Sequence, residues 1–175
     1  MRWLRWLLVC VVFTAAMAAS DNPGAEVLGR WVGGNWPLQG RTLDTEFGKA
    51  ATLKGLSTCN WSPEHVFVIC DEVVYVNNNP ERNLGVYSFD PKSGKYRYVE
   101  LTPQGAQPEV SELIITENGS RWEYRGEQEI KGRKIIFHTI NVYRDADHID
   151  WWNEYSTDGG QHWARSAEGT EIRKQ

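Results

Sequence analysis

Short motifs of enzyme active sites are absent from this 175-residue sequence. It contains no Gly-x-Ser-x-Gly nucleophile motif, no Cys-x-x-Cys pair and no glycine-rich loop of the kind that binds phosphate. These absences argue against nucleophilic, thiol-redox and nucleotide-dependent chemistry. We therefore expect a protein that is not an enzyme and that uses no cofactor and no metal.

Long runs of like charge and low-complexity tracts are lacking as well. The formal net charge is −4, and no five consecutive residues carry the same charge. An acidic chain of this kind is a poor partner for a polyanion, so we expect no nucleic-acid partner. The sequence leaves the oligomeric state open.

Long hydrophobic runs are confined to the start of the chain. Arg2 and Arg5 precede an apolar stretch from Trp6 to Ala19, which is shorter than the roughly 20 residues of a spanning helix. Ala16-x-Ala18 then offers a cleavage site. We predict a signal peptide at 1–18, a linker at 19–26, one domain at 27–175, no transmembrane span after cleavage, and a secreted or periplasmic location. An uncleaved membrane anchor is the alternative.

Cysteine is scarce, and its placement favours a disulfide. Removing Cys10 with the signal peptide leaves Cys59 and Cys70. They lie on two strand-like segments, about equally far from a turn sequence at 62–65, so neighbouring strands could bring them together. We predict a Cys59–Cys70 disulfide in the exported protein. Two buried free thiols are the alternative.

Helical periodicity is nearly absent from residue 28 onward. Segments rich in Val, Ile, Tyr, Trp and Thr alternate with clusters of turn-forming residues, which is typical of antiparallel strands with short connections. Closing so many strands into a barrel removes the exposed edges of an open sheet. We predict an all-β fold, a single antiparallel up-and-down barrel of about 8–10 strands. The strand-like segments are 28–35, 42–48, 51–60, 65–76, 84–90, 95–101, 110–116, 120–129, 133–144 and 148–157, and a further segment at 162–173 returns along the barrel after the last turn.

Two hairpins can be aligned from their turns. With Asn118-Gly119 as a two-residue turn, Ile115 pairs with Trp122 and Leu113 with Tyr124. With Ala146-Asp147 as the second loop, even-numbered residues of 136–142 share a face with odd-numbered residues of 149–155. These faces predict an apolar cavity with hydroxyl and indole groups, lined by Leu113, Ile115, Trp122, Tyr124, His138, Ile140, Val142, Trp151 and Tyr155.

The inward residues support three functions. The first is a non-enzymatic carrier or sensor that binds a small apolar or amphipathic molecule, with Trp122, Tyr124 and Trp151 in contact with it. The second is a barrel packed solid by the same side chains, which acts as an envelope protein-interaction module. The third is a barrel enzyme that uses His138 or the cluster His148, Asp150 and Glu154. That cluster is also the densest set of possible metal ligands, but we interpret it as turn and surface residues.

Several short motifs resemble known families. Gly29-Arg30-Trp31 resembles the Gly-x-Trp motif of lipocalin and fatty-acid-binding barrels, and the resemblance implies that Trp31 closes one barrel end beneath an arginine, here Arg173. The resemblance to DUF1579, a group of lipocalin-like bacterial proteins of unknown function, covers 27–175 and rests on the stretches 59–63, 67–70, 87–96 and 158–163. Nitrobindins are a neighbouring family, but His162 lacks the motif around their haem ligand.

Residues 156–163 match the Asp-box pattern Ser-x-Asp-x-Gly-x-x-Trp. We predict a structural role, in which Asp158 accepts hydrogen bonds from backbone N–H groups, Gly160 takes a positive φ, and Trp163 packs under the loop.

Overall fold

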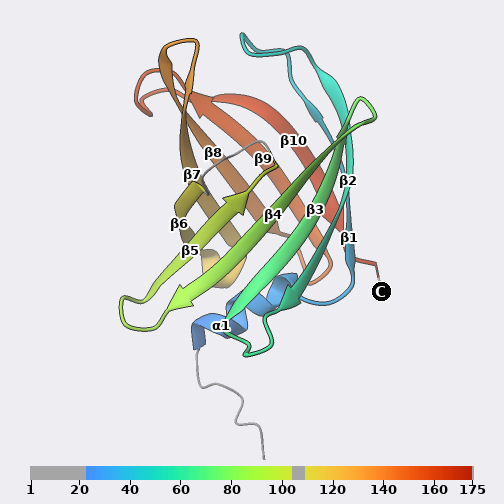
Figure 1. Cartoon of the computed structure of the whole chain (residues 1–175), viewed down its shortest axis with the longest axis vertical. Helices are drawn as coiled ribbons and strands as arrows, with labels where there is room; N and C mark the ends of the chain where they lie inside the picture. Colours follow the sequence, from blue (N-terminus) through green and yellow to red (C-terminus); the bar gives the residue numbers. More distant parts are fainter. Residues whose placement is uncertain (1–22, 104–108, 175) are drawn as a thin grey trace, which may run out of the picture.

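The computed structural model describes residues 23–103 and 109–174, and it shows a closed antiparallel barrel (Figure 1). Each strand pairs with its neighbours in sequence, and the last strand pairs with the first. The predicted all-β up-and-down barrel is therefore confirmed. The described residues form ten strands: β1 Asn35–Thr42, β2 Ala51–Trp61, β3 Phe67–Val76, β4 Asn79–Asp90, β5 Lys95–Leu101, β6 Glu109–Thr116, β7 Arg121–Ile130, β8 Arg133–Tyr143, β9 His148–Ser156 and β10 Ala164–Ile172.

The predicted signal peptide at 1–18 lies outside the described residues. Within them, no helix is long and apolar enough to cross a membrane. The predicted linker at 19–26 is described only from residue 23, where the short helix α1 (Pro23–Leu28) begins. Proline suits the first position of a helix, where its missing N–H leaves no hydrogen bond unmade.

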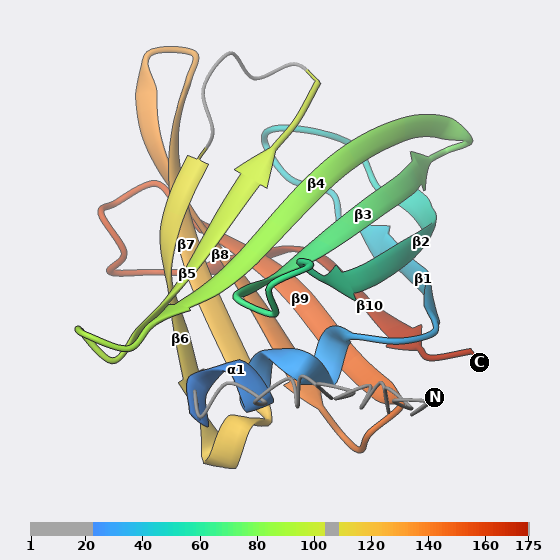
Figure 2. The same cartoon turned by 60° about the horizontal axis from the view of Figure 1, so that its bottom comes forward.

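One end of the barrel is closed by α1 and the 3₁₀ helix η1 (Gly29–Trp31), which lie across it (Figure 2). The Phe89 ring lies directly against Gly24, so any side chain at that position would meet the ring. Leu28, the last residue of α1, is fully buried and belongs to the core of this end. The expectation that the first strand runs over 28–35 is wrong, because the chain must first cross the barrel end. The predicted strand at 42–48 is also wrong, since β1 ends at Thr42 and a loop follows.

Aromatic rings fill the space inside this closed end. Trp31 is 4% exposed, and its ring lies 5.5 to 6.2 Å from the rings of Trp36, Tyr87, Trp122 and Tyr143. Edge contacts between rings stabilise such clusters beyond the area that they bury. The prediction that Trp31 lies buried at a barrel end is confirmed.

The predicted partner of Trp31 is wrong. The guanidinium of Arg173 lies 4.4 Å from the ring centre of Trp36, not over Trp31. Arg173 stays at the rim because its guanidinium donates to the backbone carbonyls of Arg30 and Val32. The Trp31 ring turns inward from this rim, so Trp36 on the neighbouring strand is the indole that the cation meets.

The predicted disulfide is confirmed. Cys59 on β2 and Cys70 on β3 are direct partners in the strand register and are bonded to each other. Both are buried, with exposed fractions of 1% and 6%, and both belong to the aromatic core of the closed end. The turn between the two strands is stabilised by Ser62, whose hydroxyl accepts from the backbone N–H of Val66.

The first predicted hairpin register is confirmed, and the second is wrong by one residue. Ile115 pairs with Trp122 as expected. Tyr143, however, pairs with Ile149 and His138 with Glu154. The backbone N–H of Arg144 donates to the carbonyl of His148 at 2.9 Å, which leaves a three-residue loop. A shift of one residue exchanges the two faces of a strand, so the residues turned outward are His138, Ile140 and Val142.

The Asp-box turn has the predicted geometry. Asp158 Oδ1 accepts from the backbone N–H groups of Gln161 and His162, each at 3.0 Å. These hydrogen bonds, with one from the His162 ring, hold the pKa of the Asp158 carboxyl well below its usual range. Gly160 has a φ of 90°, and its carbonyl accepts from the Trp163 indole at 3.1 Å.

Candidate functional site

The middle of the barrel is hollow. A cavity of about 330 Å³ lies above the aromatic core, with Trp31 among the residues that line it. It joins a wider mouth of about 470 Å³, because Tyr98, Tyr124 and Thr139 line both. Phe47 from the β1–β2 loop belongs to the mouth, so the opening lies at the end away from α1 (Figure 1). The barrel is therefore closed at one end and open at the other.

The predicted ligand-binding residues separate into distinct groups. Tyr124 and Trp151 line the cavity. Tyr155 packs against Phe47 of the mouth, with their ring centres 5.0 Å apart. Three other predicted residues lie in the packed core of the closed end: Leu113, Ile115 and Trp122.

Trp122 is a core residue and not part of the cavity wall. It is 1% exposed, and its indole N–H donates to the carbonyl of Gly119 at 2.9 Å. Its ring packs against Trp31, Tyr87 and Tyr143. The expected contact between Trp122 and a ligand is therefore wrong for this cavity.

Trp151 packs against the barrel wall at a place where two glycines face each other. Gly40 on β1 and Gly169 on β10 are register partners. A Cβ atom on either residue would lie within 2.8 Å of the Trp151 ring. The two glycines thus leave the space in which this indole packs, and the cavity stays open beside it.

Glutamates inside the barrel are the main feature that the sequence analysis missed. Glu72, Glu81, Glu100 and Glu171 all line the cavity. The strand period contained a signal for Glu72, because Cys70 points inward to its disulfide and residues two apart share a face. The expectation of an apolar cavity is therefore wrong, since carboxyl groups reach its depth.

Glu72 and Glu171 approach each other across the cavity near Ser57. The Ser57 hydroxyl donates to Oε2 of Glu72 at 2.9 Å. Burial raises the pKa of Glu72, and the Ser57 hydrogen bond only partly offsets this. Burial, followed by the nearby charge of Glu72, raises the pKa of Glu171 well above its usual range. Both carboxyls therefore hold their protons to higher pH than an exposed glutamate does.

The interior also holds polar atoms without partners among the described residues. The indole N–H groups of Trp31 and Trp151 and the hydroxyl of Tyr143 are buried donors with no acceptor. Oδ1 of Asn153 and Oε2 of Glu171 are buried acceptors with no donor. Buried polar groups in folded proteins are nearly always hydrogen-bonded, so this interior is suited to a polar guest.

The contribution of Glu171 to the stability of the ligand-free protein is expected to fall as the pH rises above 4.5, the ordinary pKa of a glutamate. Because the folded pKa of Glu171 lies above the unfolded value, the folded protein binds more protons between the two values. Stability is then lost as the pH rises through that window. Glu171→Gln keeps the shape and removes the titration. In denaturant unfolding, the free energy of unfolding of Glu171→Gln minus that of wild type should increase progressively from about pH 5 to pH 8.

The groups that face Glu171 do not reverse this expectation. Glu72 acts in the same direction, and burial raises the pKa of Tyr87 and of Tyr143 well above its usual range, so both stay neutral. The register partners of Glu171 on the adjacent strands, Leu38 and Ile149, are apolar.

His138 acts in the opposite direction, but it cancels in the comparison. Burial lowers its pKa from 6.5, so its contribution to stability is lost as the pH falls through that region. Wild type and Glu171→Gln share this group. A difference in unfolding free energy that stays constant with pH would contradict a raised pKa for Glu171.

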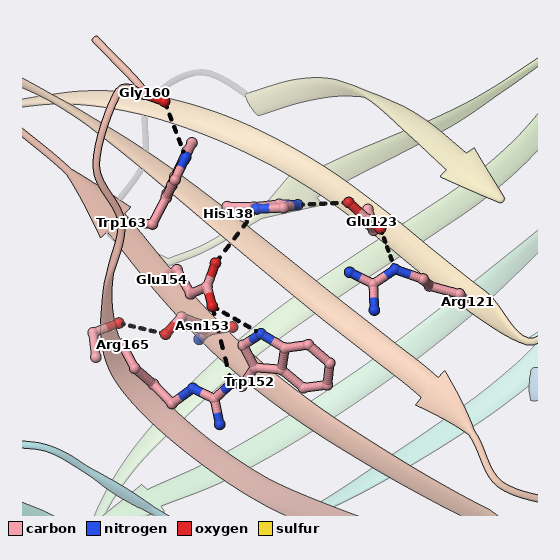
Figure 3. A network of polar contacts seen from close by, with 10 residues as sticks. Arg121, Glu123, His138, Trp152, Asn153, Glu154, Gly160, Trp163 and Arg165 are labelled. Carbon is pink, nitrogen blue, oxygen red and sulfur yellow. Dashed lines mark hydrogen bonds and ion pairs between the residues drawn. The ribbon is translucent and has the colours of Figure 1, made fainter. Parts of the chain in front are cut away.

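His138 belongs to a network on the outer face of the barrel (Figure 3). Its Nε2 lies 3.0 Å from Glu123 and its Nδ1 lies 3.8 Å from Glu154. The Trp152 indole N–H donates to Glu154 at 3.1 Å, and the Trp163 ring lies 5.2 Å from the imidazole. The contact with Trp163 holds the β9–β10 loop over the outer face of β8. His138 is not among the residues that line the cavity.

The second candidate cluster does not assemble. His148 pairs with Asp145 at 2.8 Å, and Asp150 pairs with Arg144. Glu154 is instead part of the network around His138. Over residues 23–103 and 109–174, no three His, Cys, Asp or Glu side chains come together as metal ligands.

Among solved structures, one comparison shows the fold. The chain is similar to Rv2717c from M. tuberculosis, with 13% sequence identity and a TM-score of 0.62 over 87% of this chain and 98% of that one. This is a likeness of fold. Both the likeness and the closed ten-stranded barrel of the described residues fit a lipocalin-like barrel.

A second structure matches more weakly. EF1p2_mFAP2b bound to DFHBI is 10% identical, with a TM-score of 0.42 over 86% of this chain and 99% of that one. No protein-family model and no curated protein matches the sequence. The resemblance to the DUF1579 group therefore stays a prediction.

Proposed function

We propose that this protein is an exported, non-enzymatic carrier or sensor that binds one small amphipathic molecule inside its barrel. The observation that carries the proposal is the cavity of about 330 Å³, open at one end and closed at the other by α1 and η1. Small-molecule sites in proteins usually measure about 300 to 1,000 Å³. Among the families that the sequence resembles, the lipocalin-like DUF1579 group fits this function best.

The inner surface supports an amphipathic guest. Leu38, Leu53 and Trp151 form an apolar cluster at one side of the cavity, while glutamates occupy its depth. The alternative of a solidly packed barrel describes only the closed end, where rings fill the space around Trp31. The disulfide supports export, because such bonds persist in oxidising compartments.

Two adjacent valines on β3 provide a matched test. Val74 lines the cavity, whereas its neighbour Val73 points to the opposite face of the strand and lines a depression on the outside. Val74→Phe places a ring in the cavity, and Val73→Phe adds the same ring outside. Calorimetric titration would use three probes with one aromatic body: naphthylmethylamine, naphthylmethanol and naphthylacetate.

At least one probe should bind wild type at micromolar to submillimolar concentration. Val74→Phe should weaken that binding about tenfold or more, which is about 1.4 kcal/mol, because the ring occupies the guest's space. Val73→Phe should bind like wild type. Equal binding by both variants would place the probes outside the barrel, and failure of all three probes with wild type would overturn the carrier function.

A further inference from the structure

The cavity has charged groups of one sign only. Four glutamates line it: Glu72, Glu81, Glu100 and Glu171. None of the described residues that line this cavity is a lysine, an arginine or a histidine, although the sequence contains 19 lysines and arginines. Walls of low dielectric strengthen the field of each of these groups that is ionised. A bound cation in turn favours the ionised form of the buried carboxyls, so the interior suits a cation better than an anion.

These carboxyls continue from the mouth to the depth of the cavity. Glu81 is exposed, and Glu100 also lines the mouth. Glu72 is half-buried, and Glu171 is 4% exposed. Lys49 also lines the mouth, where it is exposed and lies 4.0 Å from Asp44. Inward from the mouth, a positively charged guest would meet carboxyl groups alone among the ionisable acidic and basic side chains of the described lining.

Glu171 is the group that most needs a partner. Its Oε2 is buried and has no hydrogen-bond partner among the described residues. The Ser57 hydroxyl lies between the two carboxyls and donates to Glu72, which also accepts a hydrogen bond from the Asn83 side chain. One hydroxyl proton cannot satisfy the oxygens of both.

Two carboxyls in this position do not stabilise the empty barrel. Burying an ionisable group without a charged partner is unfavourable, and apolar side chains of the same volume would pack at lower cost. A guest that brings a positive charge and N–H donors offsets that cost, because hydrogen bonds between charged groups are the strong ones.

Aromatic faces complete the arrangement. Trp31, Tyr87, Tyr98, Tyr124 and Trp151 line the same cavity. The faces of such rings attract organic cations through their quadrupoles and also pack against the apolar body of a guest. Carboxylates combined with ring faces favour an organic cation over an inorganic one. For a metal ion, three acidic or histidine ligands would have to converge, and the described residues contain no such group.

We propose that the guest is an organic cation, a protonated amine on an aromatic or aliphatic body, whose charged group lies against Glu171 and Glu72. The inference rests on the proposed small-molecule function and names the chemical class of its ligand.

The three naphthyl probes test the cation class separately from the small-molecule function, because they share an aromatic body and differ in charge. Wild type at neutral pH should bind naphthylmethylamine about tenfold or more tightly than naphthylmethanol, and naphthylacetate more weakly still. Glu171→Gln and, separately, Glu72→Gln should weaken amine binding about tenfold and leave alcohol binding unchanged. Glu168→Gln, on the outer face of the same strand, should leave all three affinities unchanged.

The outcomes distinguish the cation class of the guest from the small-molecule function of the cavity. Alcohol binding as tight as amine binding in wild type overturns the cation class and leaves the cavity as a small-molecule site. The same holds if both glutamine variants keep wild-type affinity for the amine. Tighter binding of naphthylacetate also overturns the cation class. If no probe binds wild type, both the inference and the carrier function are overturned.

Discussion

Trp31→Ala is expected to lower the free energy of unfolding by about 3 to 5 kcal/mol, the usual range for removing a buried aromatic side chain. Trp31 is 4% exposed and contacts the rings of Trp36, Tyr87, Trp122 and Tyr143. Alanine leaves a void among four rigid rings that cannot close around it. Urea unfolding followed by circular dichroism measures the loss.

Trp152→Ala is the matched control. Trp152 lies on the outer face, where its ring contacts Arg121 and Arg165. Its truncation should cost clearly less, because solvent can replace part of what is lost. A Trp31→Ala protein within about 1 kcal/mol of wild type would show that the ring is not needed to close the barrel.

Replacing both Cys59 and Cys70 by alanine is expected to lower the free energy of unfolding by about 3 kcal/mol. The bond closes a loop with a sequence separation of 11 residues, and its loss gives the unfolded chain more conformational freedom. Reducing agent should destabilise wild type by a similar amount and leave the double variant unchanged.

A thiol count tests the bond directly. The unfolded, non-reduced protein should show no titratable thiol from Cys59 or Cys70. Two free thiols from this pair would contradict the bond, and an unfolding curve of wild type that does not respond to reducing agent would contradict its contribution to stability.

Turn chemistry decides how far the sequence predicts the register. Asn118 and Gly119 both have positive φ, which their residue types favour, and the strands on either side pair as expected. The loop after Tyr143 lacks such a signature. There the Asp145 carboxylate accepts from the backbone N–H of Asp147 at 2.8 Å and stabilises a loop one residue longer. This single residue moved His138 from the predicted interior to the outer wall.

The polar interior was harder to predict for a different physical reason. A charged residue in a strand is normally interpreted as facing water, because burying it alone is costly. Glu72 and Glu171 break this rule, and only the inward direction of Cys70 gave a sign of it for Glu72. The barrel and the disulfide follow from local patterns, and the buried Trp31 follows from the resemblance of Gly29-Arg30-Trp31 to a family motif. The carboxyl-lined cavity depends on the closure of the whole sheet.

The seam between β1 and β10 has a consequence for the order of folding. Every other strand pair in the described barrel joins neighbours in sequence, whereas this pair joins the first strand to the last. Local hairpins close short loops at a small entropic cost, and the seam must close a loop that contains the other eight strands. We therefore expect the hairpins to form before the wall is complete. Because Gly40 and Gly169 meet at this seam, the place where Trp151 packs exists only after the first and last strands have joined.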